Sequence, residues 1–335
     1  MSKVLAKDLD ALRLRRDKDI RGQSRCREDS ARNLMQVNET ACTDDIVGQL
    51  LETDMIKDIL VHIPTERPAQ PVIDASISLA SAFGAHLDAV ATGYVSTAAA
   101  YVMTGSNAAA VAAVFEMEQE QAAERATTAL STFKADAGKA GISCGSRIIA
   151  DLPAEAAVSV GTAARLYDLS IVLQPDAERR TLDDAVSTEL LLHAGGPILF
   201  IPYVFRGAFT AKRIGICWDG SQAAARALRD ARPFLAQAAT LYAVSIGEAE
   251  SGPPEASLEM LDAHLARVGL RVKSVDFPTT PGVGIQPSLL SFAADESLDL
   301  LVMGAYGHSR LKEGLFGGVT REMLQAMTIP VLMSH

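Results

Sequence analysis

Short apolar runs rich in Val, Ile and Leu alternate with longer helical patterns from Ile56 to the end of the sequence. This alternation is typical of βαβ units, in which parallel strands form a sheet and the connecting helices cover it. The pattern runs through the chain twice, and each pass predicts five strands and four helices. We therefore predict an α/β fold of two doubly wound, mostly parallel, five-stranded sheets.

The first pass places an apolar run at each expected strand and an amphipathic stretch between consecutive runs. Its helices are expected to begin at Ala69, Ala108, Pro153 and Asp183. Its strands are expected at 58–63, 86–94, 143–150, 169–173 and 197–201.

The second pass repeats this order. Its helices are expected to begin at Ser221, Pro254, Gln286 and Phe316. Its strands are expected at 213–218, 240–246, 271–276, 299–303 and 330–333.

Both passes end on similar punctuation, GPILFIP at 196–202 and TIPVLM at 328–333, and an internal repeat explains this most economically. The predicted domains are 56–203 and 210–335. An open sheet leaves unpaired backbone groups at its last strand. Pairing of the strands at 197–201 and 330–333 would satisfy these groups and make an internal pseudo-dimer.

Residues 1–55 differ from the rest, because 21 of these 55 residues are charged, against 51 of the other 280. We predict a charged N-terminal extension that is disordered or a frayed helix. Alternatively, translation starts at Met55, directly before the first expected strand.

Composition narrows the function classes. Hydrophobic residues are 48% and charged residues 21%, which is ordinary globular usage. The net charge of −10 argues against nucleic-acid binding, which depends on Lys and Arg. The four cysteines lie far apart without a Cys-x-x-Cys pair, so no metal site or disulfide framework is predicted and a reduced, cytoplasmic setting is favoured. No signal peptide is recognised, and polar residues interrupt the longest uncharged stretch, 89–115, so no membrane association is expected.

Three glycines after the fourth strand of the second pass, Gly304, Gly307 and Gly317, follow a G-x2-G-x9-G spacing. Glycines let the backbone turn with positive φ and let a ligand approach the amides, and a helix that begins here directs N–H groups at an anion. The pattern indicates a phosphate-binding loop, although a flexible connection between strand and helix would also favour glycine.

Asp219 follows the first strand of the second pass, in the run Cys217-Trp218-Asp219-Gly220-Ser221. Its carboxylate could accept hydrogen bonds from a base or a ribose, or it could cap the next helix. Neither a G-x4-G-K-[ST] nor a G-x-G-x-x-G motif is present, so the common nucleotide-binding loops are excluded.

From Ile56 to His335 the sequence resembles the universal stress proteins in their tandem arrangement, with the adenine nucleotide alpha hydrolase-like fold. The specific part of the resemblance is the pairing of Asp219 with Gly304, Gly307 and Gly317, which matches the family's ATP-binding members. The resemblance implies ATP, with or without Mg²⁺, as ligand. The implied contacts are Asp219 and Val244 for adenine, Met303, Gly304, Gly307 and His308 for ribose and phosphates, and Gly317, Gly318 and Val319 for the terminal phosphates.

The sequence departs from the family pattern in two places. Gly318 stands where the family has Ser or Thr, so a hydroxyl contact to phosphate is missing. The first pass has neither the aspartate loop, at 63–67, nor the glycine motif, at 173–180, and Pro175 removes an amide. We predict that this half does not bind ATP and serves as a scaffold.

These features lead to three functional hypotheses. The first is a cytoplasmic stress-response protein that binds ATP or a related adenine nucleotide in its second domain and regulates unidentified protein partners, with a homodimer left open. The second is an enzyme that hydrolyses ATP or transfers a phosphoryl or adenylyl group, for which no catalytic residue is assigned. The third is a nucleotide-free interaction scaffold.

Overall fold

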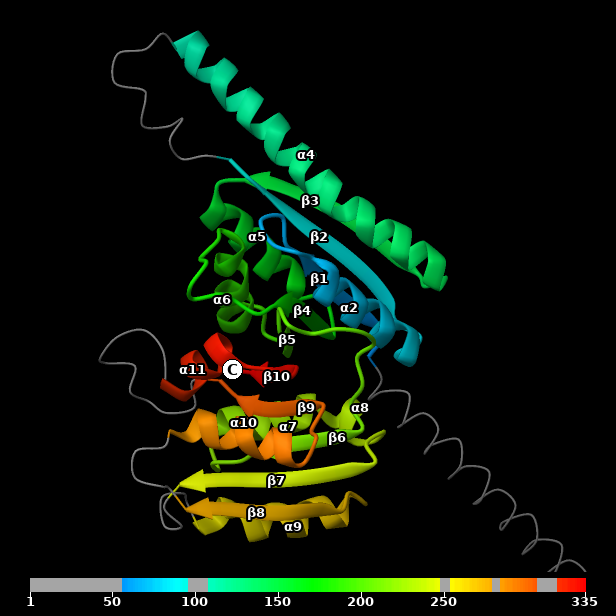
Figure 1. The fold of residues 1–335 in the computed structure, drawn as a ribbon, viewed down its shortest axis with the longest axis vertical. Coiled ribbons are helices and arrows are strands. Elements are labelled where there is room, and N and C mark those ends of the chain that lie inside the picture. Colours follow the sequence, from blue (N-terminus) through cyan, green and yellow to red (C-terminus); the bar gives the residue numbers. More distant parts are fainter. Residues whose placement is uncertain (1–55, 96–107, 248–253, 279–283, 306–317) are drawn as a thin grey trace, which may run out of the picture. The chain divides into compact units, whose positions relative to one another are not determined.

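The computed structural model describes residues 56–95, 108–247, 254–278, 284–305 and 318–335. All of these belong to one compact unit, Ile56–His335. In the first half, strands and helices alternate (Figure 1). They are β1 (Asp58–Ile63), α2 (Gln70–Phe83), β2 (His86–Tyr94), α4 (Ala108–Ala140), β3 (Cys144–Asp151), α5 (Pro153–Ala164), β4 (Leu169–Leu173), α6 (Asp183–His193) and β5 (Ile198–Ile201).

The second half repeats this order with two short additions, a four-residue helix and one 3₁₀ turn. Its elements are β6 (Arg213–Cys217), α7 (Gln222–Asp230), α8 (Arg232–Leu235), β7 (Thr240–Gly247), η1 (Pro254–Ala256), α9 (Leu258–Arg267), β8 (Val272–Pro278), α10 (Ile285–Asp295), β9 (Leu300–Gly304), α11 (Gly318–Ala326) and β10 (Val331–Ser334).

The predicted strands are all present, with ends that differ by one or two residues. The helix expected from Pro254 is a 3₁₀ turn followed by α9, because Ser257 caps a new helix by accepting the N–H of Met260. Helix α8 was not predicted. Its proline, Pro233, lies at the start of the helix, where a missing N–H costs no hydrogen bond.

The structure contains one continuous sheet instead of the two sheets that the sequence predicted. Its ten strands run in the order β3-β2-β1-β4-β5-β10-β9-β6-β7-β8. Neighbouring strands are parallel except for the central pair, in which β10 and β5 are antiparallel and Val331 lies opposite Phe200. Figure 1 shows both strands at the middle of the sheet. The expected pairing of the two last strands therefore occurs, and it merges the halves into a continuous sheet because both edges satisfy each other's backbone groups.

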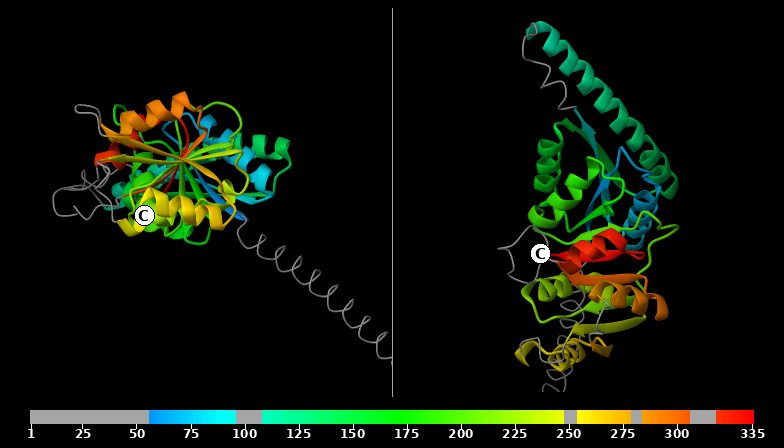
Figure 2. Two further views of the ribbon diagram at one scale, coloured as in Figure 1. Left: turned by 90° about the horizontal axis from the view of Figure 1, so that it is seen from below. Right: turned by 60° about the vertical axis from the view of Figure 1, so that its left-hand side comes forward.

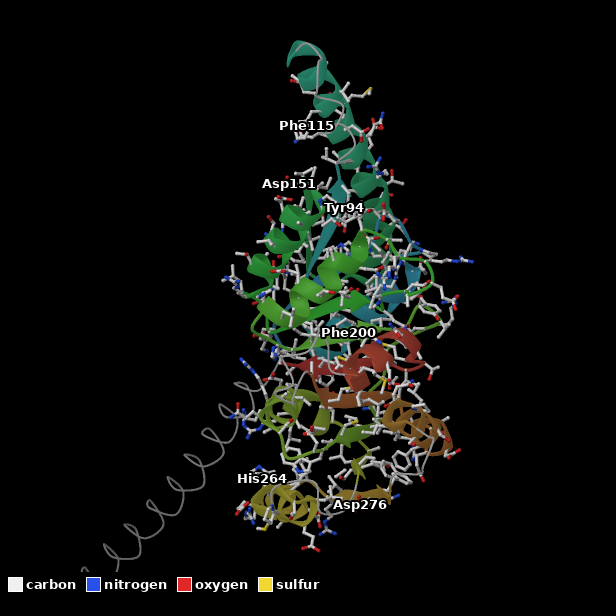
Figure 3. The ribbon with its side chains drawn as sticks, turned by 90° about the vertical axis from the view of Figure 1, so that its left-hand side faces the viewer. Tyr94, Phe115, Asp151, Phe200, His264 and Asp276 are labelled. Carbon is white, nitrogen blue, oxygen red and sulfur yellow. The ribbon has the colours of Figure 1, made fainter. Side chains whose placement is uncertain are left out.

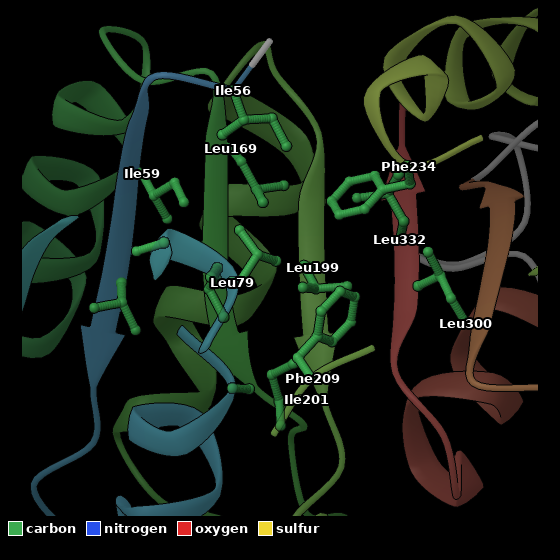
Figure 4. Close-up of a cluster of buried hydrophobic side chains, with 14 of the residues drawn as sticks. Ile56, Ile59, Leu79, Leu169, Leu199, Ile201, Phe209, Phe234, Leu300 and Leu332 are labelled. Carbon is green, nitrogen blue, oxygen red and sulfur yellow. The ribbon is translucent and has the colours of Figure 1, made fainter. Parts of the chain in front are cut away.

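Helices cover both faces of the twisted sheet (Figure 2). Helices α2, α4, α7, α8 and α9 contribute to one apolar cluster, and α5, α6, α10 and α11 contribute to the other. The first cluster crosses the boundary between the halves, since Leu199 and Leu332 pack in it together with Phe209 and Phe234 (Figure 4). The ring centroids of Phe209 and Phe234 lie 6.0 Å apart in an edge-to-face arrangement.

The central strands are apolar along their whole length because helices bury them from both sides. In β1 every residue from Ile59 to Ile63 is buried, and β4 is buried throughout. The connecting loops therefore begin at the carboxyl ends of buried strands, where ligands bind in this class of fold. Among the residues that the structure describes, no helix is long and apolar enough to cross a membrane.

Candidate functional site

The loop after β6 carries the predicted aspartate. Asp219 is exposed, and its Oδ1 accepts the N–H of Ser221 at 2.9 Å. Gly220 has a φ of 71°, the left-handed conformation that favours glycine. Ser221 then caps α7 by accepting the N–H of Ala224 at 3.1 Å. Ser221, not Asp219, therefore caps α7, while Asp219 shapes the loop and stays at the surface at the end of a buried strand.

Val244 lies beside this loop. In the register of β6 and β7 it pairs with Cys217, and its carbonyl accepts the N–H of Trp218 at 2.8 Å. Its side chain is only 1% exposed and packs in the second apolar cluster. The structure therefore places Val244 near the predicted adenine position but turns its side chain into the core.

Strand β9 brings the start of the glycine motif to the same place as the loop of Asp219, because β6 and β9 are parallel neighbours and their carboxyl ends lie side by side. Met303 is buried, and Gly304 is the last residue of the strand. A Cβ atom at Gly304 would lie 2.4 Å from the amide nitrogen of Ala224. Close packing of β9 against the start of α7 therefore requires glycine here, whatever the ligand.

The rest of the motif is only partly described. Gly307, His308 and Gly317 lie outside the described residues. Helix α11 begins at Gly318, which is exposed, and Val319 is half-buried.

Sequence reasoning missed Glu322 at this position. A Cβ atom at Gly318 would have the Glu322 carboxylate as its nearest neighbour, with Oε1 at 3.9 Å. The signal was available in the spacing, because residues four apart share one face of a helix. Glu322 and Asp219 are carboxylates that Mg²⁺ could use, although no group of three or more potential ligands occurs in the described ranges.

Cys217 lies at the same strand end. Burial raises the pKa of its thiol to about 12, and the charge of Asp219 acts in the same direction. A thiol that remains protonated at neutral pH is a poor nucleophile. Cys217 therefore acts as a packing residue.

The corresponding crevice of the first half is bordered by loop amides that its own side chains occupy. Asp183, in the first turn of α6, reaches the loop after β1, and its Oδ2 accepts the N–H groups of Thr65 at 3.1 Å and Glu66 at 3.0 Å. Its Oδ1 accepts the Tyr94 hydroxyl at 3.0 Å (Figure 3 labels Tyr94). A carboxylate of the chain thus occupies loop amides that could otherwise bind an anion.

A buried chain of hydrogen bonds continues from Tyr94. Its hydroxyl oxygen accepts the Thr92 hydroxyl at 2.6 Å, and Thr92 Oγ1 lies 3.0 Å from Nε2 of His62. Burial lowers the pKa of His62 to about 3, while burial and the neighbouring Asp183 raise the pKa of Tyr94. Burial also raises the pKa of Asp183, against the opposing effect of the Glu66 N–H. His62 is therefore a core residue whose ring has a hydrogen-bond partner in Thr92.

Arg67 closes the crevice from the other side. Its guanidinium pairs with Asp184, and Nη1 donates to the carbonyl of Gln174 at 2.8 Å. Glu66 in turn accepts the N–H of Leu182 at 2.8 Å. These contacts join the loops after β1 and β4. The equivalent loops of the second half, after β6 and β9, border its candidate site.

A hollow of about 700 Å³ opens between the start of α2 and the middle of α4. No motif marks this hollow, because its walls come from two separate stretches of the chain. They are lined by Pro64, Thr65, Arg67, Pro68, Ala69, Gln70, Gln121, Glu124, Arg125, Thr128, Ala129 and Thr132.

The fold belongs to the α/β class with helices on both faces of a mostly parallel sheet, and its candidate site lies at the carboxyl ends of β6 and β9. Residues 210–335 match the Universal stress protein family. This part of the chain is therefore a universal stress protein domain.

Two curated relatives support this assignment. Universal stress protein Slr1230 from Synechocystis is 28% identical over 142 residues, which are 41% of this chain and 46% of the relative. Universal stress protein MJ0577 from Methanocaldococcus jannaschii is 32% identical over 76 residues, which are 23% of this chain and 44% of the relative. The matches thus span less than half of each relative.

Solved structures extend the likeness of fold to both halves. A universal stress protein from Archaeoglobus fulgidus has a TM-score of 0.61 and 15% identity, over 82% of this chain and 97% of its own. A putative universal stress protein from Pseudomonas aeruginosa has a TM-score of 0.52 and 17% identity, over 84% of this chain and 94% of its own. At these identities the likeness concerns the fold alone.

Proposed function

We propose that the second half binds ATP, or a related adenine nucleotide, between the loop of Asp219 and the start of α11. One observation carries the proposal. The aspartate and the first glycine of the motif are 85 positions apart in the sequence, yet the parallel pairing of β6 with β9 brings them to one edge of the sheet. Gly318 is exposed at the start of α11, and helix N-termini bind phosphate.

The absence of a hydroxyl at Gly318 does not remove the main phosphate donors. Backbone N–H groups at a helix start point toward the ligand in any residue type, and glycine leaves them most accessible. We expect Mg²⁺, if the nucleotide carries it, to use Asp219 or Glu322.

The two halves divide the work in this proposal. They form tandem domains, 56–203 and 210–335, related as an internal pseudo-dimer about the β5–β10 pair. The first binds no nucleotide, because Asp183 and Arg67 already occupy its crevice. A protein with one nucleotide site and a filled second site is suited to nucleotide-dependent regulation of protein partners, the role that resemblance to the stress proteins implies.

An ATP-hydrolysing enzyme is the second candidate, and Glu322 is the observation that favours it. A carboxylate beside the predicted terminal phosphates could hold a metal ion or orient water. Formation of ADP over time by purified protein, lost in Glu322→Gln, would support this alternative, whereas unchanged ATP would support binding alone.

The proposal is tested by denaturing freshly purified protein and identifying the released nucleotide. We expect ATP, ADP or AMP from the unmodified protein and none from Gly317→Val. Glu178→Ala, in the corresponding loop of the first half, is the matched control and should release as much as the unmodified protein. Gly304 is unsuitable as a probe, since its substitution would disturb the packing of α7. If no nucleotide is released and none binds on titration, the scaffold hypothesis replaces this one.

A further inference from the structure

Gln174 follows β4 in the first half and reaches into the second. It is completely buried, and its Nε2 donates to the carbonyl of Leu324 in α11 at 3.0 Å. Its backbone is held on both sides, because its N–H donates to Ile201 at 2.8 Å and its carbonyl accepts Nη1 of Arg67 at 2.8 Å. Gln174 thus connects the loops of the first half, through Arg67, to α11 of the second half.

The contact lies at the carboxyl end of α11. A helix leaves its last four carbonyls without partners inside the helix. Here the carbonyl of Met323 accepts the N–H of Met327 at 2.9 Å, and the carbonyl of Leu324 accepts the side-chain amide of Gln174. An amide from the first half therefore completes the end of a helix in the second.

The other end of α11 is the predicted phosphate end. The helix has nine residues, so about 13 Å separate its two ends and a displacement of one end moves the other. Its buried side packs in the second apolar cluster through Met323 and, directly after the helix, Met327. The directional hydrogen bond from Gln174 fixes where along its axis the helix stops.

Stability alone does not account for this amide. Its Oε1 is buried and has no hydrogen-bond partner among the described residues, and leaving such an acceptor unsatisfied disfavours folding. An apolar side chain of equal length would avoid that loss but would leave the Leu324 carbonyl without its donor, so what the amide gains is the hold on α11.

We propose that Gln174 is a positioning residue for the nucleotide site, through which the first half holds α11 where its N-terminus receives the terminal phosphates. This inference rests on the proposed function. It assigns the first half a direct part in nucleotide affinity, beyond that of a scaffold.

The test compares the full-length protein with Gln174→Met, which keeps the length of the side chain and removes the donor. Titrations with ATP and with adenosine separate positioning from general damage, because adenosine lacks phosphates. We expect Gln174→Met to bind ATP about fivefold more weakly, because α11 then occupies its binding position in only a fraction of the free protein, and to bind adenosine unchanged.

Ser78→Ala is the matched control, since it removes the hydroxyl oxygen that accepts the N–H of Phe209 at 2.8 Å, away from α11. It should bind ATP normally. If Gln174→Met does not fold, Gln174→Asn, whose amide is one methylene too short, tests the same contact.

Equal loss of ATP and adenosine affinity, or no loss, would overturn the inference while the proposed function stands. Failure of the unmodified protein to bind either ligand would overturn both.

Discussion

Single residues decide what each crevice can hold. In the first half the Asp183 carboxylate sits on two loop amides, while in the second half the Asp219 carboxylate turns back onto its own loop at Ser221. The same kind of group therefore closes one site and borders the other. The sequence showed that the first half lacks the glycine motif. It did not reveal the role of Asp183, because the residues that it contacts, at 65 and 66, are more than a hundred positions away.

His62 makes the buried network sensitive to acid. Its pKa in the folded protein is about 3, below the ordinary value of 6.5, so between these pH values the unfolded chain binds a proton that the folded chain does not. Stability is therefore fully present above pH 6.5 and falls as the pH falls toward 3.

Relative to His62→Asn, the unmodified protein should lose about 1 kcal/mol of unfolding free energy per pH unit in this window. Urea unfolding at several pH values measures the difference, with His264→Asn, an exposed histidine on α9, as control. Parallel pH profiles of the unmodified protein and His62→Asn would show that His62 is not the acid-sensitive group.

At the scale of elements, strand and helix positions were largely predictable because each buried strand is a continuous apolar run between turn residues. Helix α8 was missed because four residues are too few for a periodicity. The loop of Asp219 and the glycine motif were recognised by spacing. The role of Gly304 in packing could not be recognised, because its neighbour Ala224 lies on a separate element, α7.

Gly304 and Gly318 should respond differently to substitution. Gly304→Ala places a Cβ atom against the backbone of Ala223 and Ala224 and should lower the unfolding free energy by about 2 kcal/mol. Gly318→Ala places its Cβ atom 3.9 Å from Glu322 Oε1, which is an ordinary contact, and should change it by less than about 0.5 kcal/mol. Denaturant unfolding of both variants checks this, and equal effects would mean that β9 and α7 do not pack as described.

For the whole molecule, the pairing of β5 with β10 is the decisive contact. It was expected from the unpaired backbone groups of the two last strands. The shared apolar cluster that accompanies it was not expected, and there Phe83 of the first half packs edge to face on Phe234 of the second. Sequence periodicity carries no information about such contacts between halves.

Residues 210–335 expressed alone would expose β10 along an edge whose residues are fully buried in the whole chain. Because an unpaired apolar edge pairs with another copy, we expect this fragment to be dimeric by light scattering. A monomeric, well-folded unmodified fragment would show that β10 does not need a partner strand.

The central claim is that one half binds a nucleotide and the other is filled. Calorimetric titration of nucleotide-free, full-length protein with ATP tests it most directly, because it reports stoichiometry as well as affinity. We predict one ATP per chain, abolished by Gly317→Val and retained in Glu178→Ala. Two ATP per chain, or one that persists in Gly317→Val, would contradict the account.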